Sequence, residues 1–178
     1  MQVVVIYESM FGNTRAIAEA VADGLAESTE VVVLGVAEVG PGRLASADLI
    51  VIGGPTHVHG RSRAATRKAA TDYAKKDPEL VLEPGAAEGP GVRDLAPALA
   101  GLAARAAAFD TRIDAPAVVT GRAAKGIVRM CRRAGLPVVA PPESFLVDKR
   151  NRLLEGEVDR ARAWGRQLVA ARTGGAVR

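Results

Sequence analysis

The hexapeptide Ser-Met-Phe-Gly-Asn-Thr at residues 9–14 combines residue types that can hold a phosphate group. It follows an apolar run at residues 3–7 that predicts a buried strand, and it precedes residues 16–21, whose composition predicts a helix. In a strand–turn–helix unit, the backbone N–H groups of the turn and the positive end of the helix converge on one anion. The hydroxyls of Ser9 and Thr14 add donors without adding charge. The stretch therefore predicts a loop that binds a terminal phosphate monoester.

The residues of this loop also narrow the kind of phosphate site. No Lys or Arg lies within residues 9–14, which excludes the Gly-Lys-Thr loop of nucleoside triphosphatases. A tight turn that only caps the helix after it is the remaining alternative, and the residues by themselves leave it open.

Two more segments of unusual composition each follow a predicted strand. Residues 53–60 (Gly-Gly-Pro-Thr-His-Val-His-Gly) contain glycines and a proline that fix the path of the chain and expose backbone amides. The other segment is a loop that begins with Asp-Thr-Arg-Ile at residues 110–113. Parallel strands bring their carboxyl ends to one edge of a sheet. Three loops at that edge, the first built for a phosphate, predict a flat ligand between the other two.

Apolar strand-like segments alternate with helix-like segments, which predicts a doubly wound parallel α/β fold. Strands are expected at residues 2–7, 30–36, 48–54, 105–109 and 137–147, the last interrupted by two prolines. Helices are expected at residues 14–27, 42–46, 62–76, 94–103, 121–134 and 155–172. Residues 77–92 are predicted to form a surface insertion loop, and residues 117–119 would also fit a short strand.

The composition is that of one globular domain. The 178 residues are 48% hydrophobic and 25% charged, which is ordinary for a soluble protein. No apolar run approaches the roughly 18 residues that a membrane span needs. The single cysteine, Cys131, is expected to be a structural thiol, and its isolation together with the lack of a signal-like leader favours the cytoplasm. We predict one domain over residues 1–172 and a frayed tail at 173–178.

The net charge of +4 is unevenly distributed. Residues 61–76 carry six Lys or Arg against one Asp, and residues 120–152 carry eight against two acidic residues. Such faces attract an acidic partner or substrate, and an arginine-rich solvated surface is the plainer alternative. Nucleic acid is disfavoured because only 3% of the residues are aromatic, which leaves few platforms for stacking bases.

Residues 7–14 resemble the flavin mononucleotide (FMN) phosphate loop of flavodoxins and of the flavodoxin modules in flavodiiron proteins. Residues 54–56 are similar to the second loop of that family, and residues 109–112 look like a variant of its third loop. The resemblance covers nearly the whole chain. It implies a five-stranded parallel sheet in the order 2-1-3-4-5 with helices on both faces. The FMN contacts that it implies come from Ser9, Met10, Phe11, Gly12, Asn13 and Thr14 at the phosphate, from Pro55, Thr56, His57, Val58, His59 and Gly60 on one side of the ring, and from Thr111 and Arg112 on the other.

One departure from the family concerns aromatic side chains. Flavodoxins commonly stack a tryptophan or tyrosine on the flavin ring, and neither ring loop contains one here. His57 and His59 are the flat side chains of these loops. Three interpretations stay open: ordinary exposed loop residues, packing of one histidine against the ring or a substrate, and a His-x-His metal site, for which no third ligand is evident.

A second departure is charge. Electron-carrier flavodoxins are usually acidic, whereas this chain has a pI near 9.6. Positive charge stabilises an anionic reduced flavin, so the resemblance implies a flavin that is easier to reduce than in acidic flavodoxins. Arg112 is the best-placed contributor, unless it pairs with Asp110 or Asp114.

The leading hypothesis is an FMN-binding flavodoxin-like redox protein, which transfers electrons or reduces a small acceptor through the bound flavin. If it is an enzyme, it is an FMN-dependent oxidoreductase, and no catalytic side chain or metal ligand is singled out. The expected partners are FMN and an acidic redox protein, with no membrane. The alternative is a binding or regulatory module of the same fold in which FMN binding is weak or lost.

Overall fold

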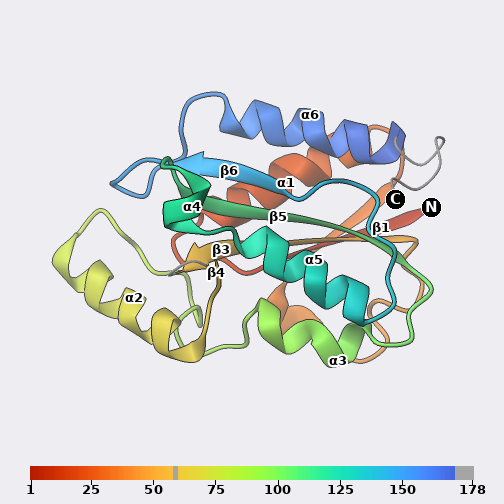
Figure 1. Cartoon of the computed structure of the whole chain (residues 1–178), viewed down its shortest axis with the longest axis horizontal. Helices are drawn as coiled ribbons and strands as arrows, with labels where there is room; N and C mark the ends of the chain where they lie inside the picture. The colour runs from red at the N-terminus through yellow and green to blue at the C-terminus, as the bar shows by residue number, and fades with distance from the viewer. Residues whose placement is uncertain (58–59, 171–178) are drawn as a thin grey trace.

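A parallel sheet forms the centre of the molecule (Figure 1). The computed structural model describes residues 1–57 and 60–170. The sheet contains β1 (Gln2–Tyr7), β2 (Glu30–Gly35), β3 (Leu49–His57), β5 (Arg105–Ile113) and β6 (Glu143–Val147). A two-residue strand, β4 (Gly60–Arg61), pairs antiparallel with the end of β3. The order β2-β1-β3-β5-β6 confirms the predicted 2-1-3-4-5 sheet, to which β4 is an addition.

Helices cover both faces of the sheet (Figure 1). The α-helices are α1 (Asn13–Ala26), α2 (Ala64–Lys76), α3 (Ala96–Leu99), α4 (Ala117–Thr120), α5 (Ala123–Arg133) and α6 (Glu157–Ala170), and the 3-10 helices are η1 (Val36–Glu38) and η2 (Val92–Leu95). Within the described residues, no helix combines the length and the apolar character that crossing a membrane requires.

Two apolar clusters hold these layers together. Alternate residues of each strand face opposite sides, so β1 places Val3 and Val5 in one cluster and Val4 and Ile6 in the other. The first cluster, under α1 and α6, includes Ile17, Val21, Leu25, Phe109, Phe145, Trp164 and Leu168. The second, under α3 and α5, includes Ile50, Ile52, Leu95, Leu99, Ile127 and Cys131. With both faces covered, the central strand β1 is an almost continuous apolar run.

Two strands are longer than predicted. β5 continues to Ile113 because residues 109–113 pair with β6, so the segment 110–113 lies in a strand and not in a loop. β3 likewise continues through Gly53 and Gly54 to His57. A β-carbon at Gly53 would collide with the ring of Phe109, so this glycine permits close packing inside the sheet and does not start a turn.

Several short segments also differ from the predictions. Residues 42–46 form isolated turns instead of a helix, because Gly42 adopts a φ of 79° and the hydrogen bonds there do not continue. Residues 117–119, which fitted a strand, lie in α4. The helix predicted at 94–103 is replaced by η2 and α3, which end before Gly101 at a φ of 76°. The predicted single domain stays a prediction, and the tail at 173–178 lies outside the described residues.

Glycines allow α1 and α6 to pack in direct contact. A β-carbon on Gly24 would collide with the carbonyl oxygen of Arg162, and one on Gly165 would collide with the carbonyl oxygen of Val21. Both glycines are buried within helices, where glycine is otherwise unfavourable. Their presence indicates that the separation of the two helices is set by backbone contact.

Candidate functional site

A cavity of about 600 Å³ lies at the carboxyl edge of the sheet. All three segments singled out from the sequence contribute to its wall, which contains Met10, Phe11, Asn13, Thr14, Pro55, Thr56, His57, Thr111 and Arg112. Ser9, Gly12 and Gly60 do not line it, and Val58 and His59 lie outside the described residues. The structure thus brings together nine of the fourteen predicted site residues.

The turn before α1 leaves the start of that helix available to an anion. Gly12 occupies the position before the helix with a φ of 88°, in the left-handed region that favours glycine. The Gly12 N–H donates to Ser9 Oγ at 3.1 Å, which tightens the turn. No side chain caps α1, and its first turn has no acidic residue. The first N–H groups of α1 therefore lack the side-chain acceptor that a merely structural cap would supply.

Side chains of the loop fix it to the rest of the site. Thr14 Oγ1 and Thr111 Oγ1 share a buried hydrogen bond of 2.7 Å, which joins the loop to the end of β5. Asn13 Nδ2 donates to the carbonyl oxygen of Asn151 at 2.6 Å. These contacts hold the start of α1 beside the end of β5 and the turn after β6.

The turn after β6 forms a fourth wall that sequence reasoning missed. Lys149, Arg150 and Asn151 line the cavity, although the sequence analysis counted the two cations only as surface charge. Asp148 Oδ1 accepts the N–H groups of Arg150 and Arg152, which shapes this turn. A cluster of charged residues directly after a predicted strand was the signal that could have placed them at the same edge.

Helix α2 supplies an aromatic side chain that the ring loops lack. Tyr73 lines the cavity and is 67% exposed. The exposed helix expected at residues 62–76 is present as α2, and it lies beside the carboxyl ends of the strands (Figure 1), a position that the sequence did not indicate. Tyr73 thus joins His57 as a flat side chain at this site.

His57 ends β3 and is half-buried in the wall of the cavity, so it is not an ordinary exposed loop residue. Burial lowers the pKa of its imidazole, and nearby Glu8 partly opposes that shift while Arg67 adds to it. Glu8 is itself buried, where it accepts the Val92 N–H at 2.7 Å and the hydroxyl of Ser62. The surroundings of His57 therefore favour its neutral form. His59, the other residue of the His-x-His metal site considered as one alternative, lies outside the described residues.

This lowered pKa predicts a stability loss in mild acid. Unfolded His57 binds a proton near pH 6.5, while folded His57 binds it only at lower pH. The free energy of unfolding should therefore be highest above about pH 6.5 and fall as the pH drops below that value. The variant His57→Gln should show a weaker fall in urea unfolding between about pH 7 and pH 5. Identical pH dependence in both proteins would contradict this assignment.

Arg112 lines the cavity but forms neither of the ion pairs considered from the sequence. Its Nη1 donates to the carbonyl oxygen of Ala115 at 2.6 Å and to that of Ile113 at 3.2 Å. Asp110 is fully buried instead, and its Oδ2 accepts the Ala124 N–H at 2.8 Å at the start of α5. The guanidinium charge therefore stays uncompensated by a carboxylate in the described part of the chain.

Comparison with known proteins decides the family. The flavodoxin family model matches residues 5–104, which is more than half of the chain. The protein belongs to the flavodoxin family. A search of curated protein sequences found no match.

Solved structures share this fold over most of the chain. A flavodoxin from the domain Archaea is 20% identical with a TM-score of 0.63, covering 96% of this chain and 97% of the other. Flavodoxin 1 from Bacillus cereus is 18% identical with a TM-score of 0.65, covering 96% and 98%. The flavodiiron protein from Giardia intestinalis is 18% identical with a TM-score of 0.61, and the match covers 96% of this chain and 36% of that one. The fold therefore extends beyond the part that the family model matches.

Proposed function

We propose that this flavodoxin-family protein binds FMN in the cavity at the carboxyl edge of the sheet. The observation that carries the proposal is the uncapped start of α1, which opens on a cavity that two other strand ends also line. A volume of about 600 Å³ is in the range of cofactor sites. The phosphate would bind at the turn before α1, and the ring would lie between the segments that end β3 and β5.

The polar groups around the cavity fit a phosphorylated flavin. Asn151 Nδ2 and Arg112 Nε are buried donors without a hydrogen-bond partner in the described part of the chain, and both residues line the cavity. Lys149 and Arg150 add positive charge beside the turn that holds Asn13. A dianionic phosphate would be attracted by these charges and by the positive end of α1.

Residues at the ring end would set the surroundings of the flavin. Tyr73 offers a flat apolar face, and neutral His57 offers a hydrogen-bonding group without charge. Arg112 keeps its positive charge at a fixed position through the carbonyl groups that it contacts. When bound, FMN supplies one-electron and two-electron redox chemistry, while the protein orients the ring and tunes its potential.

The function that follows is electron transfer, or reduction of a small acceptor, through bound FMN. The basic residues around the cavity favour an acidic redox protein as partner. No described acid/base pair or nucleophile offers a competing chemistry at the site, so the redox role belongs to the cofactor.

An anaerobic reductive titration of the FMN-loaded protein tests this function. We expect reversible reduction at a potential above that of acidic flavodoxins, because positive charge near the ring favours the anionic reduced form. Arg112→Gln should lower the potential, whereas Arg43→Gln, at an exposed position outside the cavity, should leave it unchanged. A potential as low as in acidic flavodoxins, or an equal shift in both variants, would contradict the assigned role of Arg112.

A further inference from the structure

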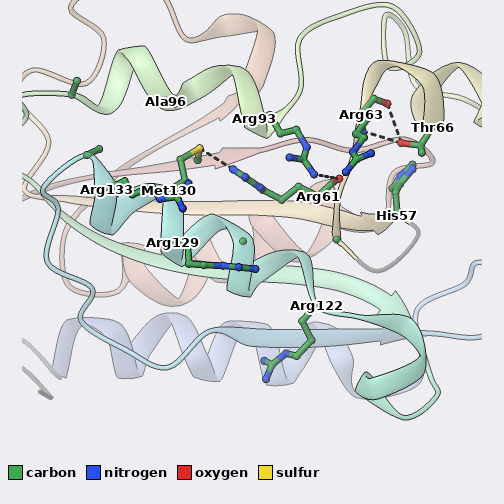
Figure 2. A pocket seen from close by; sticks show the side chains of 14 residues that line it. His57, Arg61, Arg63, Thr66, Arg93, Ala96, Arg122, Arg129, Met130 and Arg133 are labelled. Atoms are coloured by element: carbon green, nitrogen blue, oxygen red, sulfur yellow. Dashed lines mark hydrogen bonds between the residues drawn. The ribbon is translucent and has the colours of Figure 1, made fainter.

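A second and larger concavity, of about 910 Å³, lies against α5 (Figure 2). We call it the arginine groove. Its arginines are Arg61, Arg63, Arg93, Arg122, Arg129 and Arg133, and its lining residues include no Asp or Glu. His57 and Thr66 line both the arginine groove and the cavity proposed for FMN, so the two sites are neighbours.

Opposite walls of the arginine groove contribute the cationic side chains. Arg129 and Arg133 project from α5, while Arg61 lies in β4 and Arg93 lies in η2 (Figure 2). Arg61 lies across Gly126, where a β-carbon would approach its Nε to 3.1 Å, and its Nη1 donates to Met130 Sδ at 3.2 Å. The absence of a side chain at Gly126 thus lets Arg61 lie flat against α5.

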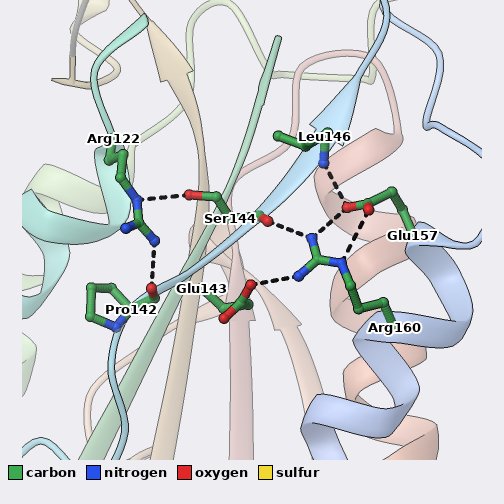
Figure 3. A network of polar contacts seen from close by, with 7 residues as sticks. All are labelled: Arg122, Pro142, Glu143, Ser144, Leu146, Glu157 and Arg160. Atoms are coloured by element: carbon green, nitrogen blue, oxygen red, sulfur yellow. Dashed lines mark hydrogen bonds and ion pairs between the residues drawn. The ribbon is translucent and has the colours of Figure 1, made fainter. Parts of the chain in front are cut away.

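Two of these arginines also have structural roles. Arg93 donates from Nε to the carbonyl oxygen of Ser62 at 2.7 Å, which fixes the segment after β4. Arg122 directs its guanidinium toward β6, where it contacts Ser144 Oγ at 2.9 Å and the carbonyl oxygen of Pro142 (Figure 3). These contacts hold both side chains in place, but neither brings a negative charge to balance them.

No carboxylate of the described residues forms an ion pair with an arginine of the groove. None of the ion pairs there includes any of the six arginines. Burial lowers the pKa of Arg61, and the neighbouring charges of Arg93, Arg129 and Arg133 lower it further. Like charges gathered in a concavity repel one another, and that repulsion is relieved when an anion binds among them.

We propose that the arginine groove binds a small polyanion with adjacent phosphate groups, such as the pyrophosphate unit of a nucleotide. Guanidinium groups match phosphate oxygens in paired hydrogen bonds, and several of them on opposite walls suit a ligand with more than one phosphate. The concave shape favours a small molecule over the broad surface of a folded partner. Such a ligand would lie beside the FMN cavity, with His57 and Thr66 between them.

Calorimetric titration of the full chain with inorganic pyrophosphate at low ionic strength tests this inference. The titration is run with and without saturating FMN, so that binding at the turn before α1 is recognised by its loss when FMN is present. The arginine groove should bind pyrophosphate in both cases, and added salt should weaken binding. The inference does not rest on the proposed redox function, because the outcome without FMN is measured separately.

Matched double variants distinguish binding in the arginine groove from nonspecific attraction of pyrophosphate to the positive surface. Arg129→Gln with Arg133→Gln removes two exposed groove cations, and we expect the dissociation constant for pyrophosphate to rise by about tenfold or more. Arg43→Gln with Arg132→Gln removes two exposed cations that do not line the groove. This double variant should change the dissociation constant for pyrophosphate by less than about twofold.

Three results would overturn the proposal. The first is no binding of pyrophosphate, and the second is equal weakening in both double variants. The third is binding of polyglutamate that pyrophosphate does not displace, which would assign the groove to an acidic macromolecule.

Discussion

Replacing Thr14 with valine should weaken FMN binding by about tenfold to a hundredfold and change riboflavin binding by less than about twofold. Valine keeps the shape of the side chain but removes the hydroxyl beside the proposed phosphate position. A hydrogen bond to a charged group contributes about 1.5–3 kcal/mol, which corresponds to this range. Riboflavin lacks the phosphate, so a loss at the phosphate end should not affect it. Quenching of flavin fluorescence measures both affinities.

Thr111→Val provides the matched control for this prediction. Thr14 and Thr111 share one hydrogen bond, so both variants lose the same internal contact. Thr111 lies at the proposed ring side, and its loss should therefore affect FMN and riboflavin alike. Equal weakening of the two ligands in Thr14→Val would mean that residues 9–14 do not hold the phosphate.

Gly24→Ala should lower the free energy of unfolding by about 3 kcal/mol, although alanine is the better helix former. Helix propensity alone would stabilise the variant by up to about 1 kcal/mol. The added β-carbon, however, would collide with the carbonyl oxygen of Arg162 in α6, and backbone cannot move aside as a flexible side chain can. The helices must separate, which opens gaps in the cluster around Trp164. Urea unfolding followed by circular dichroism measures the change.

Gly126→Ala is the control for this second prediction. Gly126 is also inside a helix, but a β-carbon there meets only the side chain of Arg61, the nearest atom at 3.1 Å. We expect the free energy of unfolding of Gly126→Ala to differ from that of the unsubstituted protein by no more than about 1 kcal/mol. If Gly24→Ala is the more stable of the two variants, the direct contact of α1 with α6 is not what the glycines provide.

The sequence was sufficient to predict the sheet and the turn before α1. Both depend on local signals: a strand buried on two faces is a continuous apolar run, and a turn leading into a helix has a characteristic composition. The start of α1 at Asn13 follows Gly12, the residue best able to adopt the left-handed conformation found there. Such features are determined within a few residues of the chain.

The remaining parts of the site depend on contacts between distant residues. Gly53 and Gly54 were placed where the predicted strand at 48–54 meets a loop, because glycine is common in turns. β3 instead continues to His57, and the ring of Phe109 requires Gly53 within the sheet. Tyr73 and Lys149 enter the cavity because α2 and the turn after β6 reach the same edge. Their separation in the sequence from residues 9–14 left no local pattern that could associate them.

The absorption spectrum of the purified protein, after incubation with FMN and gel filtration, tests the central claim most directly. The account predicts a yellow protein that carries equimolar oxidised flavin, and FMN should be recovered when the protein is denatured. A folded, colourless protein under these conditions would contradict FMN binding at the carboxyl edge of the sheet, and would favour a flavodoxin-family module without its cofactor.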